Sequence, residues 1–508
     1  MVQQPNRAAL YRGTFRPASK KLMFSQNFTA PFSIFWVSLI VYGYSLLPGV
    51  GEGDVAKFQF VGYILGTPHA TGYPLYIFLN YIFTHLFPFG SLAFKANLLS
   101  AVFAATALVV VYQILVILEC NKVIAWSFSL IFGASPSIWS QAIVAEVYTL
   151  NLLLVVLVSK HLLLWHIQKQ TLHFYLSMGI YAFSFGNHLL MITMLPALAV
   201  FIYLTDRGVF RDSKKIALVT LVICFAALQY AYPFFVYYSD RKTYIEMAVP
   251  DFKTLIWYVT GAQFKSRMFA FTLKELFLES IPRYFDFLKQ DFRYLIPLVI
   301  PGIFHIRSTQ VIMFLGLIYL GDLFFALNYA IGDIVAYFFP SHFIFLIFVT
   351  GGTSKIMSWL TRSIYQRLIR VSVYLVILVL PFCFLAVNYS KVTMRHHIQK
   401  KSMAESLITA VGKDSLIISP NYETSETLWY YLLGLNLQGE RNLFMVHHFN
   451  PEAIKNYLLK QSPLYLPEER IFVPYGMKVY VLDKNQIKKL IKVGLRVELM
   501  KDYIYRIY

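Results

Sequence analysis

The stretch GEGDVAKFQFVGYILGTPHATGYPLYIFLNYIFTHLF, positions 51–87, decides how the chain folds. It holds an amphipathic piece at 55–65, a break TPHATGYP at 67–74 and an apolar piece of 15 residues at 73–87. A membrane span needs about 20 apolar residues, and the 73–87 piece is short and bounded by proline. We therefore interpret both pieces as helices that lie along the membrane surface.

On either side of this stretch, apolar runs long enough to cross a bilayer follow one another. The first, at 31–50, is expected to be a retained transmembrane helix rather than a cleaved signal peptide. Further candidates lie at 94–118, 122–139, 146–165, 174–186, 188–205, 216–238, 294–306, 310–329, 334–350 and 371–390. The chain is thus expected to be an all-α multispan membrane protein with about eleven transmembrane helices.

Composition agrees with this class of protein. Of the 508 residues 57% are hydrophobic and 14% are charged, and the net charge is +19. Soluble domains carry about a quarter charged residues, so a soluble enzyme and a disordered chain are excluded. The basic residues sit between apolar runs, which indicates membrane topology rather than nucleic-acid binding. The cysteines Cys120, Cys224 and Cys383 form no disulfide framework.

The basic residues also predict an orientation. They gather in the segments 1–30, 119–122, 166–173, 206–215, 307–309 and 351–370. With 73–87 at the interface, all of these segments fall on one side, which the positive-inside rule makes cytoplasmic. Counting 73–87 as a full span would place the basic 206–215 and 351–370 loops outside, so the interfacial interpretation is favoured.

This topology divides the chain into three parts. Residues 1–30 form a basic cytoplasmic N-terminus, and residues 31–390 form the transmembrane domain, with external loops at 51–93 and 239–293. Residues 391–508 alternate short β-like runs, such as LIISP at 416–420, with helical stretches, such as PEAIKNYLL at 451–459. We expect this tail to be a small extracytoplasmic α/β domain.

Ionisable residues at membrane depth are costly, so each is a candidate for function. The expected topology brings most of them to one face of the membrane. They are Asp54, Lys57, His69, Tyr73, Glu146, His188, Asp333 and Tyr337. Structural roles compete with this interpretation: the two aspartates could cap helices, and His188 could bond between helices.

Other signatures point to no cofactor. The pairs His396–His397 and His447–His448 lack the spacing of a metal site, and we predict none. No glycine-rich phosphate loop is present, so a soluble nucleotide donor has no visible binding site.

An enzyme on the external face would instead take its activated group from a lipid. Sugar transfer from a polyprenyl phosphate needs a carboxylate to take or orient the acceptor's proton. It also needs cations for the departing phosphate. Asp54 fits the first role, and Lys57 or basic residues of the 239–293 loop fit the second.

The quoted stretch, continued by PFGSLAFKANLLSAVFAA, resembles the signature region of the protein O-mannosyltransferase-like family of GT-C membrane glycosyltransferases. WSQAIVAEVYTLN at 139–151 and NYAIGDIVAYFFP at 328–340 resemble later motifs of that family. The resemblance implies a GT-C fold with two helices along the membrane in the first external loop. It also implies an inverting transfer from a lipid-phosphate sugar, perhaps mannose, with Asp54 catalytic.

On this resemblance Lys57, His69 and Tyr73 would line the donor phosphate and sugar, with Glu146, His188 and Asp333 at the cavity rim. The acceptor is a hydroxyl on a protein, glycan or lipid. Two positions depart from the family pattern: Lys57 replaces a common Glu, and His69 is followed by Ala-Thr-Gly. Lys57 either removes a second carboxylate or supplies a phosphate contact.

Two other functions fit the same features: a lipid-linked sugar transporter, and an inactive relative that acts as a binding protein. The retained first span and the lack of a retention signal favour a bacterial plasma membrane.

Overall fold

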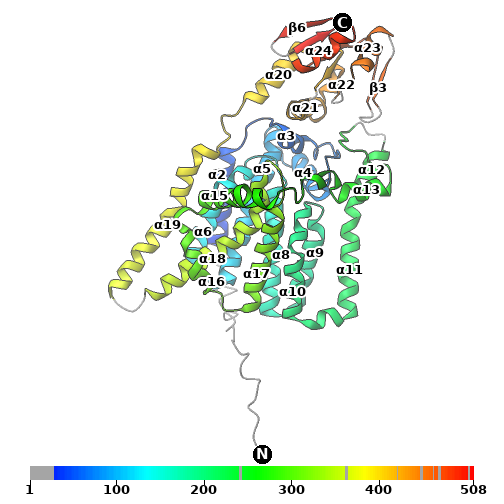
Figure 1. The fold of residues 1–508 in the computed structure, drawn as a ribbon. Coiled ribbons are helices and arrows are strands. Elements are labelled where there is room, and N and C mark those ends of the chain that lie inside the picture. Colours follow the sequence, from blue (N-terminus) through cyan, green and yellow to red (C-terminus); the bar gives the residue numbers. More distant parts are fainter. Residues whose placement is uncertain are drawn as a thin grey trace, which may run out of the picture.

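The computed structural model describes residues 28–239, 243–360, 364–419, 421–446, 450–460, 463–466, 471–501 and 504–508. Most of the expected cytoplasmic N-terminus, up to residue 27, lies outside the described residues, as do His447 and His448. The described chain forms a helical bundle with a small α/β domain above one end (Figure 1).

Helices occupy every segment that the sequence nominates as a span. They are α2 (Thr29–Ser45), α5 (Leu92–Ile117), α6 (Lys122–Gly133), α7 (Pro136–Ala142), α8 (Tyr148–Gln168), α9 (Thr171–Ser184), η2 (Leu189–Met194), α10 (Leu195–Thr205), α11 (Ser213–Ala227), η4 (Leu228–Ala231), α12 (Tyr232–Tyr238), η7 (Arg293–Leu298), α16 (Val299–Ile303), α17 (Thr309–Ala326), η8 (Ile334–Phe338), α18 (Phe339–Trp359) and α19 (Ile364–Val392). Among the described residues six helices are long and apolar enough to cross a membrane, or seven if the bent pair α6–α7 is one span. Others are shorter, such as α9 with 14 residues, so a total of about eleven stays a prediction.

Helix α5 lies at the centre of the bundle and packs against α2, α6 and α8. Its contact faces carry small side chains, among them Ala96, Ala101, Ala104 and Ala107, all buried. Small residues let helices approach closely, which is the main source of packing energy where no water is expelled.

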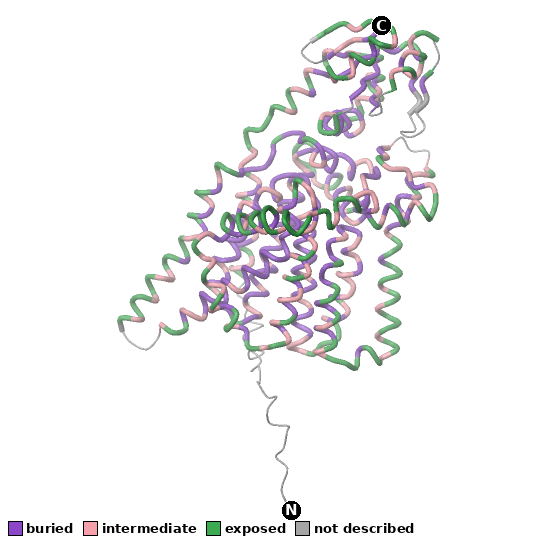
Figure 2. The backbone as a smooth tube through the Cα atoms, in the orientation of Figure 1, coloured by how far each residue is buried: buried purple, intermediate pink, exposed green. Residues whose placement is uncertain are grey.

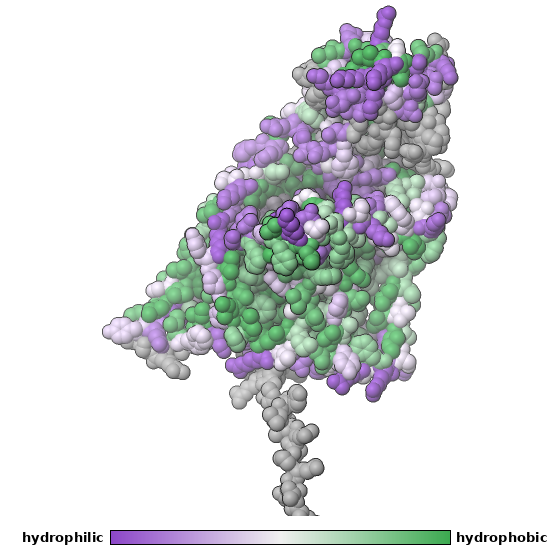
Figure 3. Space-filling model, in the orientation of Figure 1, coloured by the Kyte–Doolittle hydropathy of each residue, from purple (hydrophilic) through white to green (hydrophobic). Residues whose placement is uncertain are grey.

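The outer surface of the bundle is apolar. Figure 3 shows a hydrophobic band across the visible face of the helices, with hydrophilic residues below it and on the α/β domain above. Helices α11 and α19 have largely exposed sides (Figure 2), with apolar side chains such as Leu221 and Val376 facing outward. Exposed apolar faces of this extent are suited to lipid.

Two short helices lie across the end of the bundle that faces the α/β domain: α3 (Gly53–Phe60) and α4 (Pro74–Leu86) (Figure 1). They correspond to the pieces expected along the membrane surface. The segment 239–293, called the external segment after its predicted position, lies at the same end as far as it is described. It contains α13 (Phe252–Val259), η5 (Ala262–Arg267), α14 (Leu273–Glu275), η6 (Leu276–Ser280) and α15 (Ile281–Phe292). The loop η3 (Arg207–Arg211) lies at the opposite end.

The C-terminal region is built on a five-stranded sheet with strand order β2-β1-β5-β7-β6. Strand β1 pairs in parallel with β2 and β5, whereas β7 pairs antiparallel with β5 and β6. The expected strands at 416–420, 443–448 and 478–483 match β1, β2 and β5, and β6 and β7 were not anticipated.

The elements of this region are α20 (Gln399–Val411), β1 (Ser415–Ile418), α21 (Tyr422–Trp429), η9 (Tyr430–Gly434), α22 (Leu437–Arg441), β2 (Leu443–Val446), α23 (Pro451–Leu459), β3 (Leu464–Leu466), β4 (Ile471–Val473), β5 (Lys478–Val481), α24 (Lys484–Lys492), β6 (Val497–Lys501) and β7 (Ile504–Ile507). Its own core includes Leu416, Val446, Val479 and Leu490.

Packing between α16 and α18 gives a test of the bundle. A methyl group on Gly302 of α16 would lie 1.8 Å from the backbone oxygen of Phe348, so Gly302→Ala must push the helices apart. Overpacking of this kind costs about 1–3 kcal/mol or more, and we expect a lower melting temperature in detergent. Gly316→Ala in α17, where nothing lies within 4 Å, is the matched control. Equal melting temperatures for the two variants would contradict this packing.

Candidate functional site

A cavity of about 760 Å³ opens at the bundle end that carries α3 and α4. Seven of the eight candidate residues line it: Asp54, His69, Tyr73, Glu146, His188, Asp333 and Tyr337. They come from α3, the break at 67–74, the turns before α8 and η2, and the start of η8, which are far apart in the sequence. The helix ends therefore bring these residues together, and their individual roles stay predictions.

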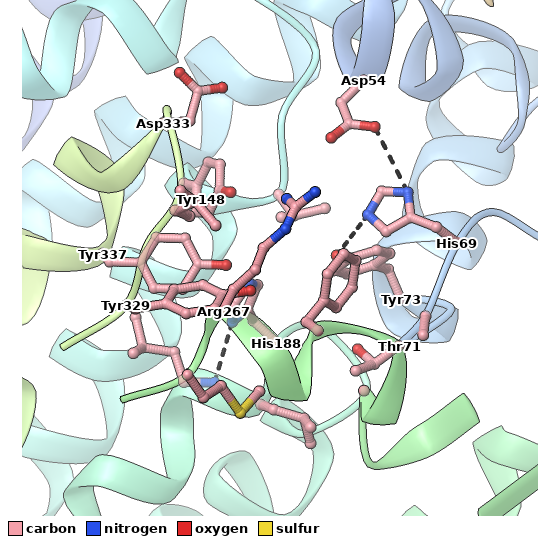
Figure 4. A pocket seen from close by; sticks show the side chains of 18 of the residues that line it. Asp54, His69, Thr71, Tyr73, Tyr148, His188, Arg267, Tyr329, Asp333 and Tyr337 are labelled. Carbon is pink, nitrogen blue, oxygen red and sulfur yellow. Dashed lines mark hydrogen bonds and ion pairs between the residues drawn. The ribbon is translucent and has the colours of Figure 1, made fainter. Parts of the chain in front are cut away.

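The labelled side chains form two walls. In Figure 4 Asp54, His69 and Tyr73 lie on one side, and Tyr148, Tyr337 and Asp333 lie on the other. The ring of His188 lies 5.7 Å from that of Tyr148 and 5.3 Å from that of Tyr337. An aromatic surface with a few carboxylates suits a sugar, because its apolar faces stack on rings while its hydroxyls find acceptors.

Asp54 is the half-exposed acid of the site, with 43% of its side chain accessible. Its Oδ1 atom accepts a hydrogen bond of 2.5 Å from the Tyr422 hydroxyl and lies 3.3 Å from Lys57 Nζ and 3.5 Å from His69 Nδ1. The contacts that the described residues make with this carboxylate all go to Oδ1. Oδ2 is thereby left for a substrate.

Lys57 corrects one expectation. Its side chain is fully buried behind Asp54 and does not line the cavity, so it is not placed to contact a donor phosphate. Its ammonium group lies 2.6 Å from Glu246 Oε2, 3.3 Å from Asp54 Oδ1 and 3.1 Å from His69 Nδ1, and it donates to the Tyr422 hydroxyl. An ammonium has three donors, and these neighbours use all of them.

The partner carboxylate, Glu246, comes from the external segment and was not anticipated. Its position is set by backbone hydrogen bonds: Thr67 donates to Tyr244 at 2.7 Å, and Glu246 donates to Thr67 at 2.9 Å. This short parallel pairing ties the external segment to the TPHATGYP break. Nothing in the local sequence around Glu246 signals it.

Charge around Lys57 sets the protonation of its neighbours. Burial alone would raise the pKa of Asp54, but His69, Lys57 and the Tyr422 hydrogen bond outweigh burial and hold this pKa below its ordinary value. Burial would likewise raise the pKa of Glu246, and the nearby Lys57 charge lowers it overall. Both carboxylates are therefore ionised at neutral pH.

The C-terminal region also reaches the site, through α21. Tyr422 and Glu423 line the cavity, and Glu426 is buried beside Lys57 and Glu246. Burial raises the pKa of Glu426 to about 8, helped by the Glu246 charge and opposed by Lys57, so Glu426 is mostly protonated at neutral pH. Its Oε1 accepts a hydrogen bond of 2.8 Å from Tyr244.

Arg267 supplies a cation on the open side of the cavity. Its side chain reaches into the space between the two walls in Figure 4 and is exposed. The backbone around it is fixed, because Ala330 donates to the Arg267 carbonyl at 2.9 Å and Met268 bridges Tyr329. The sequence pointed to basic residues of the 239–293 loop as a group, and it did not single out Arg267.

Backbone geometry in the break explains its glycine. Gly72 has φ +83°, and a methyl group there would lie 2.6 Å from the ring of Tyr258. The Tyr258 hydroxyl donates to the carbonyl of Pro68 at 2.6 Å. The break is therefore clamped by α13, which keeps His69 and Tyr73 in the cavity wall.

Metal ligation is not evident in this arrangement. In the part of the chain that the structure describes, no group of three or more His, Cys, Asp or Glu side chains is placed to hold a metal ion. His396 and His397 are exposed.

Comparison with known proteins bears on the same residues. Residues 54–209 match the family described as the protein O-mannosyl-transferase TMEM260 N-terminal domain. Protein O-mannosyl-transferase tmem260 of Dictyostelium discoideum is 32% identical over 114 residues, and the mouse protein TMEM260 is 35% identical over 109 residues. Each alignment covers 22% of this chain but only 14% and 15% of the two relatives. Both relatives are eukaryotic, so they lend no support to the expected bacterial membrane.

A solved structure covers nearly the whole chain. ArnT from Cupriavidus metallidurans bound to undecaprenyl phosphate superimposes with a TM-score of 0.60, over 94% of this chain and 97% of ArnT, at 11% identity. At this identity the likeness concerns the fold. The resemblance inferred from the sequence is thus confirmed: residues 54–209 match the N-terminal domain of TMEM260-type protein O-mannosyl-transferases, within an integral membrane protein that has the GT-C glycosyltransferase fold.

Proposed function

We propose that this protein is a membrane glycosyltransferase that moves a sugar from a polyprenyl-phosphate donor to a hydroxyl acceptor. The observation that carries the proposal is the geometry of the Asp54 carboxylate. Tyr422 and Lys57 bind its Oδ1 atom and favour the ionised form, while Oδ2 faces a sugar-sized cavity at the end of the membrane bundle. The ArnT structure binds undecaprenyl phosphate, the lipid carrier of such a donor without its sugar, which supports a lipid-linked donor for the same fold.

In the proposed reaction the acceptor hydroxyl is hydrogen-bonded to Asp54 Oδ2. Its oxygen attacks the anomeric carbon from the face opposite the phosphate, so the new glycosidic bond has inverted configuration. The bond from the anomeric carbon to the phosphate oxygen breaks, and its electron pair leaves with the lipid phosphate. The acceptor's proton passes to Asp54, which contributes as a general base.

The departing phosphate gains negative charge in this step and needs a cation near it. Arg267 is placed for that role, because its guanidinium group lies in the cavity and can bind two phosphate oxygens at once. Lys57 has a different role here: it neutralises Asp54 and Glu246 from behind and keeps both in place.

The sugar itself would lie between the two walls, with Tyr73, His188 and Tyr337 against its faces. Glu146, which is buried, and Asp333 line the same cavity and would form hydrogen bonds with its hydroxyls. Mannose is the sugar that the TMEM260-type relatives suggest.

Orientation follows from the basic loops. The η3 loop, with Arg207, Arg211, Lys214 and Lys215 in or beside it, lies at the bundle end away from the cavity (Figure 1). By the positive-inside rule we infer that this end is cytoplasmic and that the cavity is outside. A site on the outer face is consistent with a donor that is carried across the membrane by its lipid.

Asp54→Asn tests the base. Loss of the proton acceptor should lower transfer about 10²–10⁴-fold without unfolding the protein. The assay uses purified protein in nanodiscs with a radiolabelled polyprenyl-phosphate mannose and a hydroxyl acceptor. Asp286→Asn is the matched control, because Asp286 lies on the exposed face of α15 and is 62% accessible. Unchanged turnover in a folded Asp54→Asn variant would remove Asp54 from the mechanism.

Arg267→Ala tests the phosphate contact. Hydrogen bonds to charged groups contribute about 1.5–3 kcal/mol, so kcat/KM for the lipid donor should fall about 10–100-fold. Lys265→Ala is the control, since Lys265 lies two residues away on the same short helix and does not line the cavity. A loss of equal size in both variants would indicate a general charge effect and contradict a specific contact.

Lys57→Met tests the ion pairs of Lys57 with Glu246 and Asp54 through the pH dependence of stability. The pKa of Glu246 is below its ordinary value of 4.5, so the pair stabilises the fold above that pH and loses this contribution as the pH falls toward the folded-state pKa. Breaking a buried pair costs about 3–5 kcal/mol, and the variant should melt earlier at neutral pH and lose much of the acid dependence.

Lys289→Met, which breaks the exposed pair with Asp286, should change neither property. Identical pH–stability curves for wild type and Lys57→Met would contradict a stabilising role of the ion pair between Lys57 and Glu246.

A further inference from the structure

The C-terminal domain is joined to the active-site helix by specific contacts. Thr427 of α21 donates to the carbonyl of Gly51 at 2.9 Å, just before α3. The Tyr430 hydroxyl accepts from the backbone of Ala93 at the start of α5, at 3.1 Å. Together with the Tyr244–Glu426 hydrogen bond, these contacts hold α21 in one position over the cavity.

Tyr422 is the first residue of α21, and its place is set by the helix start. The side chain of Asn421 accepts from the backbone N–H of Thr424 at 2.9 Å, which caps the helix. Lys57 Nζ lies 4.6 Å from the centre of the Tyr422 ring. Gly53, immediately before Asp54, passes close to the same ring. These contacts fix the ring of Tyr422, so its hydroxyl has a defined position next to the Asp54 carboxylate.

We propose that Tyr422 is a positioning residue of the active site, and that the C-terminal domain is for this reason a component of the catalytic machinery. The Tyr422 hydroxyl accepts a hydrogen bond from Lys57 and donates one to Asp54 Oδ1. This relay fixes the rotation of the carboxylate so that Oδ2 faces the cavity. The catalytic part of the inference rests on the proposed glycosyl transfer, whereas the contact itself does not.

The hydrogen bond from the Tyr422 hydroxyl is the shortest contact that Asp54 makes. Without the hydroxyl, Oδ1 keeps only the longer contacts to Lys57 at 3.3 Å and His69 at 3.5 Å, which leave the carboxylate more freedom to rotate. Acceptor hydroxyls would then be aligned less often, so the effect falls on kcat more than on binding of the donor.

The pH dependence of Asp54 should report the same contact. Donation by Tyr422 favours the ionised carboxylate and contributes to its lowered pKa. The titratable and charged groups that face Asp54 from the elements around it are Lys57, His69, Tyr73, Glu146, Tyr148, His188, Glu246, Arg267, Asp333, Tyr337, Tyr422, Glu423 and Glu426. Removing one hydroxyl leaves the other groups in place, so any shift is attributable to Tyr422.

Tyr422→Phe in the 508-residue chain, in nanodiscs, is the test. We expect kcat to fall about 10-fold or more with little change in the KM of the lipid donor. The acid limb of the rate–pH profile should move to higher pH. Carbodiimide labelling of Asp54, followed by mass spectrometry across pH, should show its midpoint move in the same direction, because the protonated carboxyl is the form that reacts.

Two control variants separate positioning from docking. Tyr244→Phe removes a hydroxyl that holds α21 through Glu426 and does not touch Asp54. Tyr475→Phe removes an exposed hydroxyl elsewhere in the same domain. Both should keep the wild-type labelling midpoint of Asp54.

The outcomes are distinguishable. A labelling midpoint that is the same in wild type and Tyr422→Phe overturns the proposal, and so does a midpoint that moves equally in Tyr244→Phe. Absence of transfer by the wild-type protein would count against the proposed function, and with it the catalytic role of Tyr422. The labelling midpoint would then still decide whether Tyr422 holds Asp54.

Discussion

One buried ammonium group organises the end of this bundle. Lys57 has no exposed surface, and a buried charge is tolerated only when it is paired and hydrogen-bonded. Its partners come from three parts of the chain: Asp54 and His69 in the segment 51–87, Glu246 in the external segment and Tyr422 in the C-terminal domain. Because the buried ammonium group needs these partners, three segments that are distant in the sequence are held together around Lys57 Nζ.

This arrangement explains how the chain tolerates a lysine in the motif that resembles the O-mannosyltransferase-like family. At the level of sequence, Lys57 looks like the loss of a carboxylate three residues after Asp54. In the structure the carboxylate of Glu246 lies 2.6 Å from the lysine, contributed by the external segment. The carboxylate that is missing at position 57 is thus supplied by position 246, which is 189 residues further along the chain.

Much of the fold and part of the site could be predicted from the sequence. Asp54, Glu146 and Asp333 were identified because acids are rare in apolar chains and the parity of the spans sends them to one face. The position of Lys57 was predicted wrongly, since a motif gives the residue type and not the direction of its side chain. Glu246 and Tyr422 were missed because their contacts depend on tertiary docking, which leaves no periodic pattern near either residue. Strand β6, with the mixed sequence VELMK, lacks the run of neighbouring apolar and aromatic residues that reveals β1 and β5.

The separation between Asp54 and Tyr422 also matters for biosynthesis. The two residues are 368 positions apart, and the bundle between them is made before α21 leaves the ribosome. At the stage when α3 is already in place, Lys57 has Asp54 and then Glu246 as partners but lacks the tyrosine. The contact between Tyr422 and Asp54 is therefore made late, when α21 has been synthesised and has docked. A chain that stops before α21 would insert its helices without acquiring the hydrogen bond between Tyr422 and Asp54.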